Sequence, residues 1–168
     1  MANYDVRLVG LNDTRGRLNW QMRRHLGHVH GGSSKDPQPG EVAVCLRNDY
    51  SGADPVFNGS LWNIETAERS AERKLPIMRL ALRSADNGHS RTNVRVPVEC
   101  FSRDETKYLP GLQQFGYGYA LTVHKAQGSA WNNVLMINEA RCFRQHARRW
   151  LYTGITRASD QLTIVDYR

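Results

Sequence analysis

Cysteine is scarce in this 168-residue sequence, and long apolar runs are missing from it. The three cysteines, Cys45, Cys100 and Cys142, are odd in number and far apart, with no CxxC pair, which argues against a disulfide framework or a Cys-based zinc site. No apolar run approaches the roughly 18–20 residues that a membrane-spanning helix needs. The N-terminus also lacks the basic start and apolar core of a signal peptide. We therefore expect a cytoplasmic protein with no membrane partner.

A phosphate-binding loop is missing as well. The sequence contains no G-x-x-x-x-G-K-[ST] and no acidic strand of the Walker B type. Without the loop that cradles phosphates and the carboxylate that holds Mg²⁺, the chain cannot act by itself as a P-loop ATPase. Three histidines, His25, His28 and His30, share one loop, but no Cys or carboxylate lies at ligand spacing, so we predict no metal site.

Basic residues, in contrast, are in excess. The chain has 23 Lys and Arg against 16 Asp and Glu, a formal net charge of +7. An excess of this size favours a polyanionic partner, with nucleic acid first among the candidates. The alternative is a charged surface that serves only solubility.

The two ends of the chain have the texture of α/β units. Residues 5–11, "DVRLVGL", predict a short buried strand, and Asn12 or Asp13 can cap a following helix with an apolar stripe. Near the C-terminus we predict a strand at "YALTV" and a turn opening a helix at "HKAQGSAW". A strand at "NNVLMIN", a helix at "CFRQHARRWLYTGITRA" and a closing strand at "QLTIVDY" follow.

The middle of the chain has a different texture. Short strands, "EVAVCLR", "SLWNIET", "PIMRLALR" and "TNVRVPVECF", alternate with turn signals, and a helical period is visible only around "ETAERSAERK". Four or five strands in about 60 residues suggest a small antiparallel barrel. We therefore predict an α/β domain formed by residues 1–40 and 104–168, interrupted by a barrel at 41–103. Neither α/β piece can bury its apolar face alone, so "DVRLVGL" and "YALTV" should share one sheet.

Polar side chains cluster where "YALTV" should end. Thr122, His124, Lys125 and Gln127 all donate hydrogen bonds, and Gly128 allows close approach of a ligand to the backbone. In a parallel sheet, ligands bind beyond the carboxyl ends of strands. This set suits a phosphodiester backbone, because it can donate bonds without reading bases.

Two motifs carry a family resemblance. "YALTVHKAQGS" followed by "LYTGITRA" and a final "LTIV" strand resembles motifs V and VI of superfamily-1 DNA helicases of the RecD-like branch. Upstream, "LVGLNDTRGRLNWQMRRHLG" and "VAVCLRNDY…VFNGSLWNI" resemble a strand–helix segment and the start of an inserted Src-homology-3-type barrel. The resemblance touches about two thirds of the chain. It implies a RecA-like second motor domain with a parallel sheet, interrupted by that small antiparallel barrel.

The resemblance also implies roles for single residues. Thr122, His124, Lys125 and Gln127 would line the track of single-stranded DNA. Arg157 would be the catalytic arginine finger that reaches the γ-phosphate of ATP, supported by Tyr152, Thr153 and Thr156. Gly128 and Arg15 would also belong to the ATP site. Two tryptophans, Trp131 and Trp150, are more typical of core residues than of base-stacking platforms.

Two departures from the family pattern matter. The family usually carries Glu after Q-G-S, where it contacts the nucleotide ribose, and this chain has Ala130. The first motor domain and the motif IV arginine are not in the sequence. ATP and Mg²⁺ would therefore be used only with a Walker A/B-bearing motor domain, in cis or in trans.

The chain is a helicase fragment, a separately encoded half or a remnant. The alternative function is a non-enzymatic module, derived from a helicase, that binds nucleic acid or a partner protein.

Overall fold

A computed structural model describes residues 4–29, 36–50, 55–72, 75–102 and 109–166. The chain divides into two compact units. The first, here called the parallel unit, comprises residues up to 21 and from 119 onward. The second, the antiparallel unit, comprises residues 22–118. The continuous segment of the second unit thus separates two pieces of the first along the chain.

The parallel unit contains a four-stranded sheet in the order β7-β1-β8-β9, in which every neighbouring pair is parallel. Its strands are β1 (Val6–Val9), β7 (Ala120–Thr122), β8 (Trp131–Asn138) and β9 (Ala158–Asp166). Leu8 lies opposite Leu121 on one side and is paired with Met136 on the other. The prediction that "DVRLVGL" and "YALTV" share one sheet is confirmed.

Burial explains the order of these strands. All four residues of β1 and all three of β7 are buried, whereas most of β9 is exposed. A parallel strand covered on both faces needs a continuous apolar run, and "VRLV" and "ALT" come close to one. The edge strand β9 can carry polar residues, because water hydrogen-bonds the backbone groups on its unpaired side.

Helix α1 (Asn12–His25) follows β1 and is tied to β7 by one side chain. The Asn19 amide donates to the Ala120 carbonyl at 3.1 Å, and its oxygen accepts from the Ala120 N–H at 2.9 Å. Both groups are buried, so the pair satisfies backbone atoms that the short strand β7 would otherwise leave unpaired. This link fixes α1 beside the strand from which the predicted site emerges.

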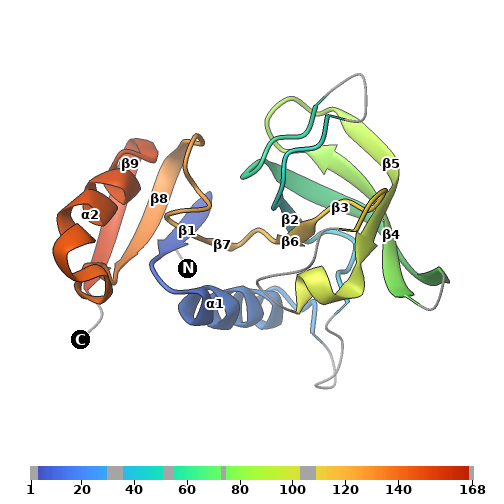
Figure 1. Cartoon of the computed structure of the whole chain (residues 1–168), viewed down its shortest axis with the longest axis horizontal. Coiled ribbons are helices and arrows are strands. Elements are labelled where there is room, and N and C mark those ends of the chain that lie inside the picture. The colour runs from blue at the N-terminus through green and yellow to red at the C-terminus, as the bar shows by residue number, and fades with distance from the viewer. Residues whose placement is uncertain (1–3, 30–35, 51–54, 73–74, 103–108, 167–168) are drawn as a thin grey trace. The chain divides into compact units, whose positions relative to one another are not determined.

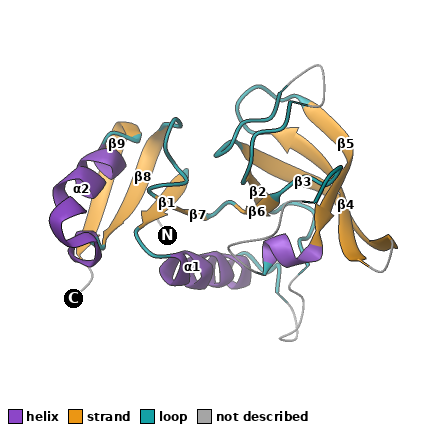
Figure 2. Cartoon of the chain, in the orientation of Figure 1, coloured by secondary structure: helices purple, strands orange, loops and turns teal. Residues whose placement is uncertain are grey.

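Helix α2 (Ala147–Ile155) lies between β8 and β9 in the chain and packs on the sheet, as Figures 1 and 2 show. Gly154 makes this close packing possible: a Cβ there would lie 2.5 Å from Met136 Cε. The predicted helix at 142–158 is only partly correct. It begins as a 3-10 segment, η2 (Ala140–His146), and Arg144 inside η2 has φ 47°. The helix predicted after "YALTV" is wrong, since residues 123–128 form a turn.

The antiparallel unit contains a five-stranded sheet in the order β5-β4-β3-β2-β6. The strands are β2 (Val42–Cys45), β3 (Leu61–Glu72), β4 (Leu75–Ser84), β5 (Ser90–Pro97) and β6 (Phe115–Tyr117), with a 3-10 turn η1 (Val98–Phe101) after β5. Two ladders change register, between Ile64 and Thr66 and between Leu80 and Leu82. Such irregularities bend and twist long strands.

The bounds of this unit differ from the predicted domain limits of 41 and 103. Strand β6 lies beyond the predicted limit of 103 and pairs with β2. On the other side, Arg23 at the end of α1 is fully buried against Glu41, with Nε–Oε1 at 2.6 Å. The strand pairing and the ion pair both draw flanking residues into the antiparallel unit. Within the described ranges, neither helix is long and apolar enough to cross a membrane.

Candidate nucleic-acid interface

The turn after β7 is built by its own backbone. Thr122 Oγ1 accepts the Lys125 N–H at 3.3 Å, and the Thr122 carbonyl accepts the Ala126 N–H at 3.0 Å. Thr122 is buried, so the hydroxyl that we predicted to contact DNA caps the turn instead. Gly128 has φ 89°, a left-handed conformation that glycine adopts without strain. Apart from Gly128 and its two chain neighbours, no described residue has a heavy atom within 4 Å of a Cβ placed there.

The same turn separates apolar from polar residues. Val123 and Ala126 are buried, His124 and Gln127 are exposed, and Lys125 is half-buried. The apolar pair anchors the turn while the three polar side chains remain available to a ligand. The structure therefore brings together three of the four residues predicted to bind DNA.

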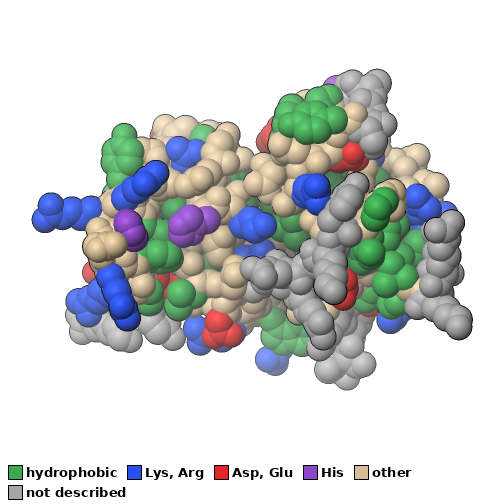
Figure 3. All heavy atoms as spheres, viewed as in Figure 1, with side chains coloured by type: hydrophobic (Ala, Val, Ile, Leu, Met, Phe, Trp, Pro, Cys, Tyr) green, Lys and Arg blue, Asp and Glu red, His purple; other side chains and the backbone are tan. Residues whose placement is uncertain are grey.

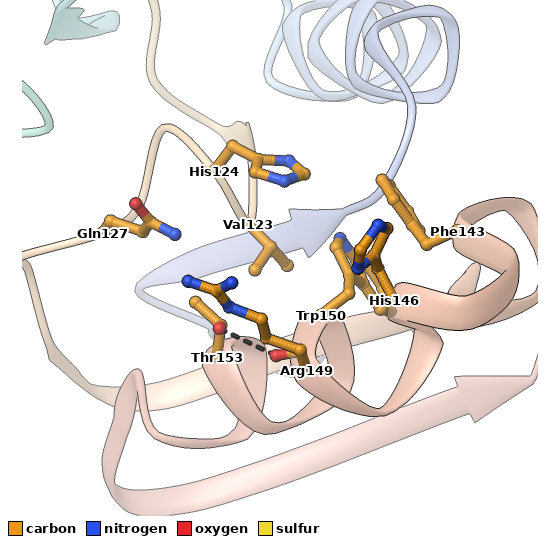
Figure 4. A pocket seen from close by; sticks show the side chains of 8 residues that line it. All are labelled: Val123, His124, Gln127, Phe143, His146, Arg149, Trp150 and Thr153. Carbon is orange, nitrogen blue, oxygen red and sulfur yellow. Dashed lines mark hydrogen bonds between the residues drawn. The ribbon is translucent and has the colours of Figure 1, made fainter.

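A pocket of about 390 Å³ opens beside this turn. Figure 4 shows that His124 and Gln127 line it from the turn, while Phe143 and His146 come from η2. Helix α2 contributes Arg149, Trp150 and Thr153 from the opposite side, and Val123 lies between them. The pocket thus lies at the carboxyl edge of the parallel sheet, where α/β proteins bind ligands.

Aromatic rings form one wall of the pocket. Phe143 stacks on Trp150, with ring centroids 5.0 Å apart and an interplanar angle of 11°. The His124 ring is tilted by 49° to the Phe143 ring, with centroids 5.5 Å apart. A Cβ on Gly10 would lie 2.7 Å from the Phe143 ring, so the β1–α1 turn packs closely against this ring.

An arginine and a histidine also line the pocket, from α2 and η2. Arg149 and His146 are exposed, and Figure 3 shows His side chains with Lys and Arg side chains near them on this face of the parallel unit. In Figure 4 the Arg149 guanidinium extends toward Gln127 across the opening. Neither His146 nor Arg149 was singled out by the sequence. The signal that could have found them is the basic run "RQHARR" before motif VI.

Arg157 lies apart from the pocket and is held by acceptors nearby. Its guanidinium donates to the Thr153 carbonyl at 3.1 Å, the Ser129 carbonyl at 2.9 Å and the Thr156 hydroxyl at 3.1 Å. The side chain is half-buried. These bonds join the end of α2 to the end of the turn after β7, so Arg157 connects the two motif regions.

Arg15, which we predicted to bind nucleotide, is buried in α1 with a relative exposure of 6%. Burial lowers the pKa of its guanidinium. Such a position is typical of a packed residue, and Arg15 does not line the pocket beside Gln127.

The sequence did not single out Glu139, whose carboxylate links β8 to the start of α1. It follows β8, is 7% exposed, and accepts the N–H groups of Gly10 at 2.6 Å and Leu11 at 3.0 Å. Its other oxygen accepts the Thr14 hydroxyl at 2.6 Å. The carboxylate thus occupies the N-terminal end of α1, where a helix attracts anions. The helix N-terminus of the β1–α1 unit is filled by the protein's own anion.

The described part of the chain contains no group of three or more His, Cys, Asp or Glu residues that could hold an ion. His25 is exposed and His28 is half-buried. His30, the third histidine of the predicted loop, lies outside the described residues.

Residues 117–165 match the UvrD-like helicase C-terminal domain family. The chain is 29% identical over 149 residues to the ATP-dependent RecD2 DNA helicase of Deinococcus radiodurans, covering 86% of this chain and 17% of that protein. It is 42% identical over 53 residues to the RecBCD enzyme subunit RecD of Buchnera aphidicola, covering 32% of this chain and 9% of that protein. The chain therefore spans less than a fifth of the length of these relatives.

Solved structures show the same fold. The Pif1 helicase of Candida albicans has a TM-score of 0.54 at 14% identity, over 97% of this chain and 45% of that one. A Bacteroides Pif1 bound to single-stranded DNA has a TM-score of 0.53 at 15% identity, over 99% of this chain and 42% of that one. At this identity the likeness shows a common mixed α/β fold, with one parallel and one antiparallel sheet.

Proposed function

Because this chain is a C-terminal part of a superfamily-1 helicase, we propose that it supplies half of a track for single-stranded DNA and an arginine finger. The DNA contacts come from His124, Lys125 and Gln127. The nucleotide is ATP with Mg²⁺, held by a motor domain that carries the Walker A and B motifs, in cis or in trans. The chain alone would not hydrolyse ATP.

The observation that carries the DNA contacts is the turn after β7. Buried Val123 and Ala126 fix it, and three donors of different chemistry are exposed or half-buried on one side. Donors on a fixed turn suit phosphate oxygens, which position a strand without reading its sequence. The Bacteroides Pif1 relative is described as bound to single-stranded DNA, which supports the same ligand class here.

Two features support Arg157 as the finger. Its three acceptors are two backbone carbonyls and a hydroxyl, so these bonds orient the guanidinium without neutralising its charge. They also link it to the turn that we propose to contact DNA. A cation held this way can stabilise charge on a transferring phosphoryl group, and such a finger contributes about 10³–10⁵ in rate.

We further propose that the antiparallel unit is a barrel of the Src-homology-3 type. Long strands β3 and β4 are paired with register shifts that bend them. The first and last strands of the sheet order also approach one another through the segment before β6. There the Gln113 N–H donates to the Arg95 carbonyl at 2.8 Å, and an Arg95 Nη2 donates to the Gly111 carbonyl at 2.9 Å. Contacts across the sheet edges are what a closing barrel requires.

The DNA proposal is tested by anisotropy of a labelled oligo-dT strand across a salt series. Lys125→Ala should weaken binding and reduce the salt slope by about 0.7, the value for one phosphate contact on a single strand. His124→Ala and Gln127→Ala should weaken binding without changing that slope at pH 8. The charge-matched control is Arg24→Ala, which removes an exposed cation from α1. Equal losses in the Lys125 and Arg24 variants would mean that the net charge, and no defined track, binds DNA.

The ATPase proposal is tested by mixing the chain with a motor domain that carries G-x-x-x-x-G-K-[ST]. Activity should require both proteins, and Arg157→Ala should reduce it at least about 1000-fold. The alternative function, a non-enzymatic binding module, predicts DNA binding with no stimulation of any such partner. Turnover by this chain alone would contradict the proposal directly.

A further inference from the structure

Two exposed aromatic side chains lie together on the antiparallel unit. Tyr50 follows β2 and is 69% exposed, and Phe57 is 55% exposed. Their rings meet edge to face, with centroids 6.4 Å apart and an interplanar angle of 80°. Single apolar side chains on a surface are ordinary, but a contiguous exposed patch marks an interaction site. The pair therefore indicates a binding surface.

A pocket of about 320 Å³ lies beside Tyr50. Residues 47–50, which follow β2, line one part of it, and residues 111–114, which precede β6, line the rest. Asn48 connects the elements of this surface: its amide donates to the Tyr50 hydroxyl at 3.0 Å, and its oxygen accepts the Asn58 N–H at 2.7 Å. These bonds order the surface before a ligand arrives, which lowers the entropic cost of binding.

Two buried amide oxygens at this surface have no hydrogen-bond partner among the described residues. They are Oε1 of Gln113, which lines the pocket, and Oδ1 of Asn58, which follows Phe57. The Gln113 amide nitrogen already donates to the Asp49 carboxylate. Buried polar atoms nearly always have a partner, so both oxygens call for a donor. A polypeptide offers an N–H at nearly every residue, whereas a phosphodiester backbone offers acceptors. The chemistry thus favours a peptide over a nucleic-acid backbone.

Cations outnumber carboxylates around the pocket. Arg47 lines it and is exposed, and Arg95 donates to the carbonyl of Gly111 on its rim at 2.9 Å. Asp49 is the one acidic residue among the described residues that line the pocket. Complementary charge across an interface favours the right partner over wrong ones. A bound segment should therefore carry an acidic side chain beside Arg47.

We propose that this surface binds an extended segment of a partner protein. An apolar side chain of the segment packs on Tyr50 and Phe57, a backbone N–H donates to Gln113 Oε1, and an acidic side chain lies beside Arg47. The inference goes beyond the proposed function and does not rest on it, because every residue involved belongs to the antiparallel unit and none is on the proposed DNA track.

The surface is tested with a library of random dodecapeptides displayed on phage and selected on the immobilised full chain. Enriched peptides should combine an apolar residue with an acidic one. Tyr50→Ala and Phe57→Ala should each weaken the binding of synthetic copies at least about 30-fold, as expected of a hot spot. The matched control, Leu26→Ala, removes an exposed apolar side chain of the same unit outside the pocket. It should change the affinity less than about twofold. Anisotropy of the labelled peptides measures all of these affinities.

A charge exchange tests the acidic contact. Arg47→Ala should weaken a selected peptide only about twofold to fivefold, because the pair is exposed, and Arg47→Glu should weaken it about tenfold through repulsion. Replacing the acidic residue of the peptide by Lys should restore binding to the Arg47→Glu chain and weaken binding to the wild type. Failure of the Lys peptide to restore binding would overturn the acidic contact.

An N-methyl scan of the same peptide tests the backbone bond. Methylation at one position should weaken binding to the wild-type chain about tenfold, because the buried oxygen loses its donor. The same peptide and its unmethylated parent should bind Gln113→Met equally, since that variant has no acceptor. An equal loss in the two chains would overturn the bond to Gln113.

The remaining outcomes separate this surface from other ligands. A selection that enriches no peptide, or peptides that bind Tyr50→Ala as tightly as the wild type, would overturn the inference. Tyr50→Ala should leave the affinity for oligo-dT unchanged, and a loss there would assign the surface to nucleic acid instead. Self-association that Tyr50→Ala abolishes, measured by sedimentation, would assign it to a second copy of the chain. No binding of oligo-dT to the wild-type chain would overturn the proposed function and leave this inference standing.

Discussion

The two units each bury a carboxylate at the junction of a helix and a sheet, and they satisfy it by different means. In the antiparallel unit, Glu41 is fully buried against the Arg23 guanidinium, which donates at 2.6 and 3.1 Å. In the parallel unit, Glu139 accepts three neutral donors, two backbone N–H groups and the Thr14 hydroxyl. An ion pair holds one junction, and a helix N-terminus holds the other.

This difference predicts how strongly a single substitution at each junction lowers the stability of the fold. Removing one partner of a buried ion pair leaves an uncompensated charge, which is far more costly than losing the pair altogether. Around Glu139 two of the three donors are backbone N–H groups, which substitution cannot remove. The antiparallel junction should therefore be fragile to single changes, and the parallel junction more tolerant.

The largest effect is expected at the ion pair. Arg23→Met should lower the free energy of unfolding by about 3–5 kcal/mol, because it leaves the buried Glu41 carboxylate without its cationic partner. The double variant Arg23→Met with Glu41→Leu should recover most of this loss. Urea unfolding followed by circular dichroism measures both.

The control for this experiment is the ion pair of Arg83 and Glu65, whose side chains are 54% and 36% exposed. Arg83→Ala should cost less than about 1 kcal/mol, because solvent screens the pair. If Arg23→Met were as mild as Arg83→Ala, the buried pair would not be what holds this junction.

A smaller effect is expected at Glu139. Glu139→Gln preserves the shape of the side chain, but it weakens the bonds to Gly10 and Leu11 and turns an amide NH₂ toward one of the donors. Hydrogen bonds to charged groups contribute about 1.5–3 kcal/mol, so the loss should fall in that range. Urea unfolding again measures it. A loss above that of Arg23→Met would reverse the comparison between the two junctions.

Much of this fold follows from local patterns in the sequence. The apolar runs of β1 and β7 predicted a shared parallel sheet, because neither chain segment could bury its face alone. The irregular parts did not follow in the same way. Strand β6 is three residues, "FGY", inside a long loop, and only its pairing with β2 makes it a strand. "ETAERSAE" has a helical period but becomes part of β3, because residues 66–72 pair with β4.

The DNA-binding roles of the candidate site residues stay a prediction, and their geometry followed only in part from the sequence. His124, Lys125 and Gln127 follow from the rule that polar residues after a buried strand face a ligand. The buried position of Thr122 did not follow, since its hydroxyl is used by the turn itself. Glu139 could not be found from sequence, because its partners are 125–129 residues away along the chain.

The smallest expected effect on stability comes with a large difference in thiol reactivity between Cys45 in the antiparallel unit and Cys142 in the parallel unit. Cys45 is 1% exposed in the antiparallel unit, where burial raises the pKa of its thiol from 9.0 to about 11. Its sulfur also donates to the Arg47 carbonyl at 2.8 Å. At pH 8 a shift of this size lowers the thiolate fraction about 100-fold, and the thiolate is the reactive form. Iodoacetamide should therefore modify exposed Cys142 in the native chain and modify Cys45 only after urea unfolds it. Because the native pKa lies above the unfolded one, the thiol's contribution to stability is complete below about pH 9 and is lost as the pH rises toward 11. Cys45→Ala should remove that part of the alkaline decline in melting temperature, whereas Cys142→Ala should leave it unchanged. Rapid labelling of Cys45 in the folded protein at pH 8 would show that the interior of the antiparallel unit opens readily.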